Sequence, residues 1–213
     1  AAMRLDGCDG KSSTEAANYH TAPGALPRSL ENASAQTRES LLAMLRSRDP
    51  TPEAMQNMLL VFQGGDVDPK VAAECLAKLT EWNRRTPHIT QQLCAKLRVH
   101  GTLVSVLTRH ACDIDVARAA LGAIVACVLH SAESASALTR CGVLLQMYTM
   151  MEVHNRDRIV LDNASVALWK LAERGSARQI VLTGGVSKLI AAMLENPLNP
   201  FLQTNGCAAL QAL

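Results

Sequence analysis

Histidine and cysteine are the side chains of this sequence best suited to bind a metal ion or to take part in nucleophilic catalysis. The chain contains six His and seven Cys residues. No Cys-x-x-Cys or His-Glu-x-x-His segment occurs, so the usual spacings of zinc ligands are missing. His110 and Cys112 are close in the sequence, but two ligands make an incomplete zinc site. The sequence therefore predicts neither a metal site nor a cofactor.

Four of the histidines lie near the C-termini of expected helices. They are His100, His110, His130 and His154. At the C-terminus of a helix, a His interacts favourably with the helix dipole and with unpaired carbonyl groups. We therefore predict a structural role for these four side chains.

The sequence also lacks the motifs of common enzyme classes. It contains no Gly-x-Ser-x-Gly segment, no phosphate-binding loop and no dinucleotide-binding fingerprint. The segment GGDVDP at 64–69 resembles a calcium loop only superficially, because the spaced acidic ligands and the terminal Glu are missing. We interpret this segment as a turn with a helix cap, and we predict that the chain is not an enzyme.

Composition favours helices. The chain has 32 Ala and 29 Leu against 15 Val and 6 Ile, and only six residues are Phe, Tyr or Trp. Ala and Leu are strong helix formers, whereas β-branched and aromatic residues favour strands. The sequence therefore predicts an all-α protein.

Charge and hydropathy limit the classes of partner. The 21 basic and 19 acidic residues leave a formal charge of +2, which gives no electrostatic case for nucleic acid or an acidic membrane. The longest apolar run, 119–129, is too short to span a bilayer and indicates a buried helix. We expect no nucleic-acid partner and no direct membrane insertion.

The cysteines and the first residues bear on location. Most cysteines lie within apolar helical patterns, where a free Cys behaves as a small hydrophobic residue. The start of the chain, AAMRLDGCDG, has no apolar segment typical of a secretory signal. These features predict an intracellular protein, cytoplasmic in the first place, with a nuclear or cytoskeletal location as alternatives.

The chain divides into a tail and a helical region. Residues 1–32 carry few large apolar side chains and are interpreted as an extended or disordered tail. A helix is expected over 34–47, and from residue 50 a capping side chain repeatedly precedes a proline. This pattern occurs at Thr51-Pro52, Asp68-Pro69, Thr86-Pro87 and Asn199-Pro200. Because proline fits the first helical position, we predict about eleven short helices joined by tight turns.

Two sequence patterns recur along the helical region. The segments KLRVHGTLVSVL, ALTRCGVLLQMY and VLTGGVSKLIAAM align on Gly101, Gly142 and Gly185, which are 41 and 43 residues apart. A longer helix is expected after each, with a small residue at the same place. These small residues are Ala120, Ala164 and Gly206, and an earlier copy has Cys75. We expect the longer helices to pack closely at these positions, because repeat units bury their apolar faces by stacking.

On these segments the sequence resembles the armadillo repeat family, most strongly over 137–213 and more weakly back to about Pro52. The resemblance implies a right-handed superhelix of about four three-helix repeats, in which the third helices line a concave groove. The predicted repeat domain covers 33–213, with units of roughly 50–86, 87–130, 131–174 and 175–213. Members of this family usually bind extended peptides or helices in the groove and are not enzymes.

The expected groove positions recur at i, i+3 and i+7 of each third helix. The candidate binding residues on these helices are Glu74, Glu81, Arg118, Gly122, Ala126, Asn163, Val166, Lys170 and Asn205. Asn163 and Asn205 match a groove asparagine of many armadillo proteins. An Asn amide has both a donor and an acceptor for a peptide backbone, although a structural hydrogen bond within the repeat is an equal alternative.

Two ligand classes of the family are not expected here. Nuclear import adaptors have Trp at i+3 and Asn at i+7, whereas this chain has Val166 and Lys170 there in its third unit. Catenin-like members have a run of basic groove residues, but here positive side chains such as Arg118 are scattered. We expect an amphipathic helix with apolar anchors against Gly122, Ala126 and Val166.

The leading hypothesis is a noncatalytic scaffold or adaptor that binds a partner peptide or helix in this groove. Alternatives are a structural or self-assembling cytoskeletal piece of a longer solenoid, and a chaperone cofactor on the same fold. The chain ends at Leu213 inside an expected third helix, and an open apolar end favours self-association or a further repeat. Partner identity and biological process stay open at this point.

Overall fold

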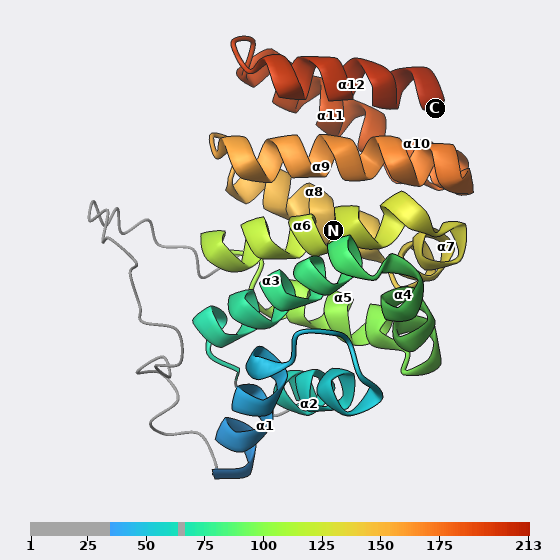
Figure 1. Ribbon diagram of the computed structural model, residues 1–213. Coiled ribbons are helices and arrows are strands. Elements are labelled where there is room, and N and C mark those ends of the chain that lie inside the picture. Colours follow the sequence, from blue (N-terminus) through green and yellow to red (C-terminus); the bar gives the residue numbers. More distant parts are fainter. Residues whose placement is uncertain (1–34, 64–66) are drawn as a thin grey trace.

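The computed structural model describes residues 35–63 and 67–213, and these residues form helices and turns without a strand (Figure 1). The helices are α1 (Ala35–Arg46), α2 (Pro52–Gln63), α3 (Pro69–Arg85), α4 (Pro87–Lys96), α5 (Val99–Arg109), α6 (Ile114–His130), α7 (Ala132–Arg140), α8 (Val143–Val153), α9 (Arg158–Leu171), α10 (Ala177–Leu182), α11 (Gly185–Glu195) and α12 (Pro200–Ala212). A kinked π-helical turn (Ala172–Ser176) joins α9 to α10. The all-α class is confirmed, and the predicted tail 1–32 lies outside the described residues.

The longer helices form two rows. In one row α3 contacts α6, α6 contacts α9 and α9 contacts α12, and in the other α2, α5, α8 and α11 contact one another in the same order. Figure 1 shows α12, α9, α6 and α3 one below another, with α11 and α8 behind them. The short helices α4, α7 and α10 connect the two rows. Helices that start 42 to 47 residues apart in the chain are thus direct neighbours, on the order of one repeat length.

Small residues are buried along the row of α3, α6, α9 and α12. Cys75, Ala120 and Ala164 have no exposed surface, and Gly206 is buried as well. A Cβ atom on Gly206 would lie 2.5 Å from the Met193 sulfur of α11, so a side chain at this position would force Met193 to move. The four positions expected to be in close contact therefore lie in the core.

Proline and capping residues start several helices as predicted. The Thr51, Asp68 and Asn199 side chains accept hydrogen bonds from backbone N–H groups in the first turns of α2, α3 and α12. Thr86 precedes α4 but does not cap it, because its hydroxyl donates instead to the Trp82 carbonyl oxygen at 3.3 Å. The cap expected at Thr86 is therefore wrong, although Pro87 does begin the helix.

The predicted histidine positions are correct for three of the four. His110 and His154 are the residues at which α5 and α8 end, and His130 is the last residue of α6. The His154 Nε2 atom lies 3.0 Å from the Ala111 carbonyl oxygen, which ties the end of α8 to the end of α5. His100 was expected near a helix C-terminus but lies in the first turn of α5, where it is buried.

Left-handed residues precede α5, α8 and α11. Their φ angles are 53° at Arg98, 87° at Gly142 and 80° at Gly184. The sequence alignment on Gly101, Gly142 and Gly185 is therefore corrected, since Gly101 and Gly185 lie inside their helices. Glycine adopts this conformation without strain, but a residue with a Cβ is disfavoured there. Arg98 is the one non-glycine residue with a positive φ in the part of the chain that the structure describes.

Replacing Arg98 with glycine is expected to raise the free energy of unfolding by about 0.5–1 kcal/mol. Relief of left-handed strain, roughly 1–2 kcal/mol, exceeds the entropy that glycine adds to the unfolded chain, roughly 0.5–1 kcal/mol. Urea denaturation followed by circular dichroism measures the change. The control Arg84→Gly, inside α3, should lower stability by about 1 kcal/mol. A loss of stability in Arg98→Gly would contradict the strain.

Candidate functional site

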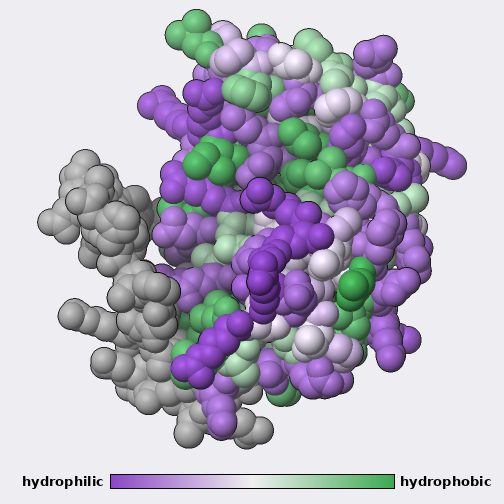
Figure 2. Space-filling model, in the orientation of Figure 1, coloured by the Kyte–Doolittle hydropathy of each residue, from purple (hydrophilic) through white to green (hydrophobic). Residues whose placement is uncertain are grey.

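The candidate binding residues all lie on the row of α3, α6, α9 and α12. Glu74 is exposed, and seven others are partly exposed: Glu81, Arg118, Gly122, Asn163, Val166, Lys170 and Asn205. Ala126 was expected to face the groove but is buried, with 6% of its surface exposed. Figure 2 shows the side of the molecule on which these helices lie, with hydrophobic side chains among many hydrophilic ones. One face of the helix row therefore carries the predicted set.

A hollow of about 210 Å³ lies on this face between α3, α6 and α9. Its lining residues are Thr80, Asn83, Arg84, Gly122, Val125, Ala126, Leu129, His130 and Asn163. The hollow brings together three of the predicted residues, Gly122, Ala126 and Asn163. The other six, Glu74, Glu81, Arg118, Val166, Lys170 and Asn205, do not line it.

Gly122 leaves this hollow open. A Cβ atom at Gly122 would lie 3.9 Å from the Thr80 hydroxyl oxygen and 4.0 Å from the Asn163 amide nitrogen. These are ordinary van der Waals distances, so packing in the free protein does not require a glycine. Its absence of a side chain, in the middle of α6, gives a ligand access to space between Thr80 and Asn163.

Asn83 is a polar residue of the hollow that sequence reasoning missed. Its side chain is fully buried, and its amide nitrogen donates to the Leu79 carbonyl oxygen at 3.1 Å. Its amide oxygen Oδ1 has no hydrogen-bond partner among the described residues. A buried acceptor without a partner is unfavourable by roughly 1–3 kcal/mol, and a donor from a ligand would relieve this. The sequence signal was an Asn on the buried face of a helix that is otherwise apolar there.

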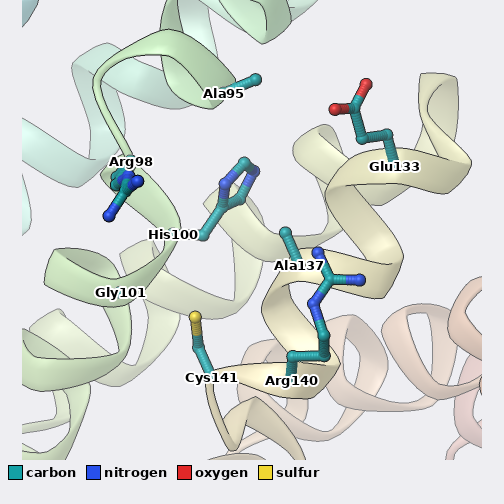
Figure 3. A pocket seen from close by; sticks show the side chains of 8 residues that line it. All are labelled: Ala95, Arg98, His100, Gly101, Glu133, Ala137, Arg140 and Cys141. Carbon is teal, nitrogen blue, oxygen red and sulfur yellow. The ribbon is translucent and has the colours of Figure 1, made fainter.

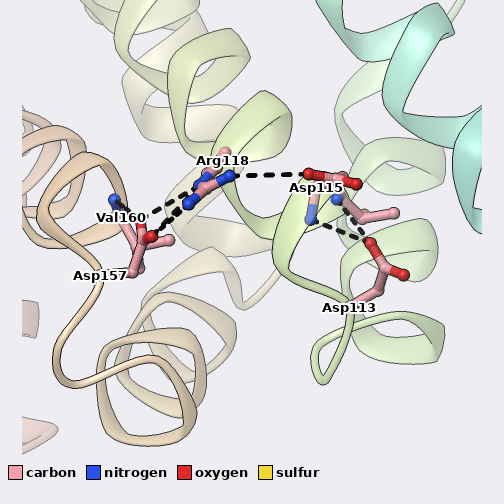
Figure 4. A network of polar contacts seen from close by, with 6 residues as sticks. Asp113, Asp115, Arg118, Asp157 and Val160 are labelled. Carbon is pink, nitrogen blue, oxygen red and sulfur yellow. Dashed lines mark hydrogen bonds and ion pairs between the residues drawn. The ribbon is translucent and has the colours of Figure 1, made fainter. Parts of the chain in front are cut away.

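Arg118 is held by acidic groups of the protein itself (Figure 4). Its Nη2 atom lies 2.5 Å from the Asp157 carboxylate, and its Nη1 atom lies 3.7 Å from that of Asp115. Asp157 also caps α9 by accepting from the Val160 N–H at 2.9 Å. Burial alone would raise the pKa of Asp157, but the hydrogen bonds from Arg118 and Val160 outweigh it and lower the pKa. Arg118 therefore links α6 to the start of α9.

A second contact of the same kind joins α9 to α12. The Asn199 side chain, which caps α12, donates to the Asp162 carboxylate of α9 at 2.7 Å. Asp162 and Arg118 are both the fifth residue of their helices. Two successive pairs of this row, α6 with α9 and α9 with α12, are thus each joined by a polar side chain of one helix and the capping residue of the next.

The other charged candidates also have partners nearby. Lys170 lies 2.9 Å from the Glu173 carboxylate and 3.5 Å from the centre of the Trp169 ring. Glu81 lies 2.9 Å from the Lys78 amine, and the hydrogen bond from Lys78 lowers the pKa of Glu81. The pKa of Glu74 is raised, first by the partial burial of its carboxylate and then by the nearby Asp68 carboxylate. Since these ion pairs offset the charges of Lys170 and Glu81, the face suits an apolar ligand better than a highly charged one.

No group of three or more His, Cys, Asp or Glu side chains in 35–63 and 67–213 is arranged to hold a metal ion. No single helix in the described residues is long and apolar enough to cross a bilayer. One bent pair, Arg158–Leu182 and Gly185–Glu195, meets at 95° and together has the length and composition of a membrane span, which is no more than a match in length and composition.

Comparison with protein-family models, curated proteins and solved structures found no match to this chain. The interpretation of the candidate site therefore depends on the geometry of the hollow and on its polar groups.

Replacing Asn83 with leucine is expected to leave the free energy of unfolding unchanged or to raise it by up to about 1 kcal/mol. Leucine has a similar shape and removes an unpaired buried acceptor. Thermal and urea denaturation measure the effect. The control Thr90→Val removes a buried hydroxyl that does have a partner, the Thr86 carbonyl oxygen at 2.9 Å, and should lower stability by about 1 kcal/mol. A loss as large in Asn83→Leu would make Asn83 a structural residue.

Proposed function

We propose that the chain is a noncatalytic armadillo-type interaction module, a scaffold or adaptor built as a right-handed superhelix of three-helix units. The two rows of stacked helices support this architecture, because repeat proteins bury their apolar faces against like helices of neighbouring units. The left-handed residues Arg98, Gly142 and Gly184 support it further, since they recur at the same place before α5, α8 and α11. The proposed units are roughly 50–86, 87–130, 131–174 and 175–213.

The proposed ligand is a partner peptide or amphipathic helix lying across α3, α6 and α9. The observation that carries this proposal is the hollow beside the unpaired Asn83 Oδ1 atom. Val125, Ala126 and Leu129 offer apolar contacts to an anchoring side chain, whose burial contributes on the order of 1.5–3 kcal/mol. Asn163 is partly exposed at the α9 wall and supplies an amide for a backbone group of the ligand. The buried Asn83 Oδ1 atom would accept from a ligand N–H once its side chain turns into the hollow.

Filling the hollow should weaken this binding. Binding peptides are first selected on the parent protein from a random library displayed on phage. Their affinity for the Gly122→Leu variant should be at least about tenfold lower than for the parent, because the new side chain occupies the space of the anchoring side chain. Fluorescence anisotropy of the selected peptides measures the affinity.

The matched control is Ser105→Leu, which adds the same side chain at an exposed position of α5. Peptides should bind this variant as they bind the parent. Selected peptides that bind Gly122→Leu as tightly as the parent would remove the hollow from the proposed function.

Self-association is a second candidate function, favoured by apolar residues around α11 and α12. Leu194, Leu198 and Phe201 are large apolar side chains that are 75%, 93% and 60% exposed. Figure 2 shows hydrophobic side chains at the end of the molecule where α12 lies. Burying such side chains against a second copy would be favourable.

Light scattering distinguishes this candidate from a monomeric module. If α11 and α12 mediate self-association, the mass of the parent protein should rise with concentration and that of Leu198→Glu should not. Leu145→Glu is the control, since Leu145 is an exposed leucine of α8 and 58% exposed. A parent protein that stays monomeric at every concentration would exclude self-association through this surface.

A further inference from the structure

A second hollow, of about 370 Å³, lies between α4, α5 and α7 and shares no lining residue with the first. Polar side chains from three places line it: Arg98 before α5, His100 in its first turn, and Glu133 and Arg140 of α7. Figure 3 shows the His100 ring between Arg98 on one side and the α7 residues on the other. Its volume falls within the range of small-ligand pockets, roughly 300–1,000 Å³.

His100 is a buried polar group without a partner in this hollow. Only 6% of its surface is exposed, and its Nε2 atom makes no hydrogen bond with any described residue. Burial lowers the pKa of His100, which favours the neutral imidazole. A neutral imidazole can donate one hydrogen bond, and polar groups buried to this extent are usually paired. The unpaired nitrogen therefore points to a ligand.

Arg98 adds an independent observation. Among the described residues, Arg98 is the one left-handed residue that is not glycine. The equivalent positions before α8 and α11 are Gly142 and Gly184. Strained residues of this kind cluster at functional sites. At this junction the strain places a guanidinium group at the edge of the hollow, where glycine would place none (Figure 3).

The charges of the hollow favour a ligand with one negative charge. Arg98 and Arg140 make no ion pair with any residue in 35–63 or 67–213, and Arg140 donates one hydrogen bond to the Ser136 hydroxyl at 2.8 Å. Glu133 is the acidic residue of the lining. Two guanidinium groups and one carboxylate give the hollow a net charge of +1, which one carboxylate ligand would neutralise. A phosphate dianion would bring a charge of −2 and would be repelled by Glu133.

We propose that this hollow binds a carboxylate between Arg98 and Arg140, with the imidazole of His100 as a further donor. Guanidinium groups bind carboxylates through paired, charge-assisted hydrogen bonds. The carboxylate belongs either to a small organic acid or to the acidic side chain of a peptide. The proposal does not depend on ligand binding across α3, α6 and α9.

Titration with small carboxylates, followed by NMR of the His100 ring, tests the proposal. The probes are acetate, the capped peptide acetyl-Gly-Glu-Gly-amide, its Gln counterpart and inorganic phosphate. We expect saturable shifts of the His100 signals with the Glu peptide or with acetate, and none with the Gln peptide. Arg98→Gly should weaken this binding at least about tenfold without lowering the melting temperature.

Two further variants complete the experiment. Arg140→Gln should weaken binding as Arg98→Gly does, and it keeps the test decisive if one variant folds poorly. Arg156→Gln removes the same charge from an exposed turn after α8 and should bind as the parent does. Binding of acetate assigns the site to free acids as well as peptides, and binding of the Glu peptide alone assigns it to peptides.

Three results would overturn the proposal. They are equal binding of the Gln and Glu peptides, tighter binding of phosphate than of either carboxylate, and an equal loss of affinity in Arg156→Gln and Arg98→Gly. None of these results affects the Gly122→Leu experiment, so the two proposed sites are tested independently.

Discussion

The whole structure depends on one interaction, the packing of each long helix against its counterpart 42 to 45 residues later in the chain. α3, α6, α9 and α12 have 13 to 17 residues, so most of their stability comes from packing, and each buries its apolar side against like neighbours. Buried small residues such as Ala120 and Ala164 bring these helices close together. The exposed face of the same row then becomes a continuous surface, and this surface carries the hollow at Gly122.

Polar contacts set the alignment of this row. Arg118 joins the capping carboxylate of α9, and Asp162 joins the capping amide of α12, each from the fifth position of the preceding helix. Apolar packing alone allows helices to slide along one another, whereas a bond to a capping residue fixes one end. Arg118 belongs to this alignment, which explains why a basic residue occurs at this position of the face.

Local sequence signals predicted most of the helices because their causes are local. Proline after Asp68 or Asn199 starts a helix through the neighbouring N–H groups, and helical spacing marks the buried side. Two errors concern local conformation that the residue types alone do not reveal. The left-handed junction at Arg98 has no glycine that would have predicted it. The Thr86 hydroxyl donates to the Trp82 carbonyl oxygen of the preceding helix instead of capping α4. Asn83 and His100 became candidate ligand contacts only once the surrounding helices were in place.

The left-handed junctions differ in how freely their chemistry can change. At Gly142 and Gly184 any side chain would add strain, so these two turns constrain the residue type. At Arg98 the backbone already holds a side chain in this conformation, and other side chains meet the same conformational demand. Sequence divergence at that single position can therefore alter what the surface between α4 and α7 presents, while the path of the chain into α5 is retained.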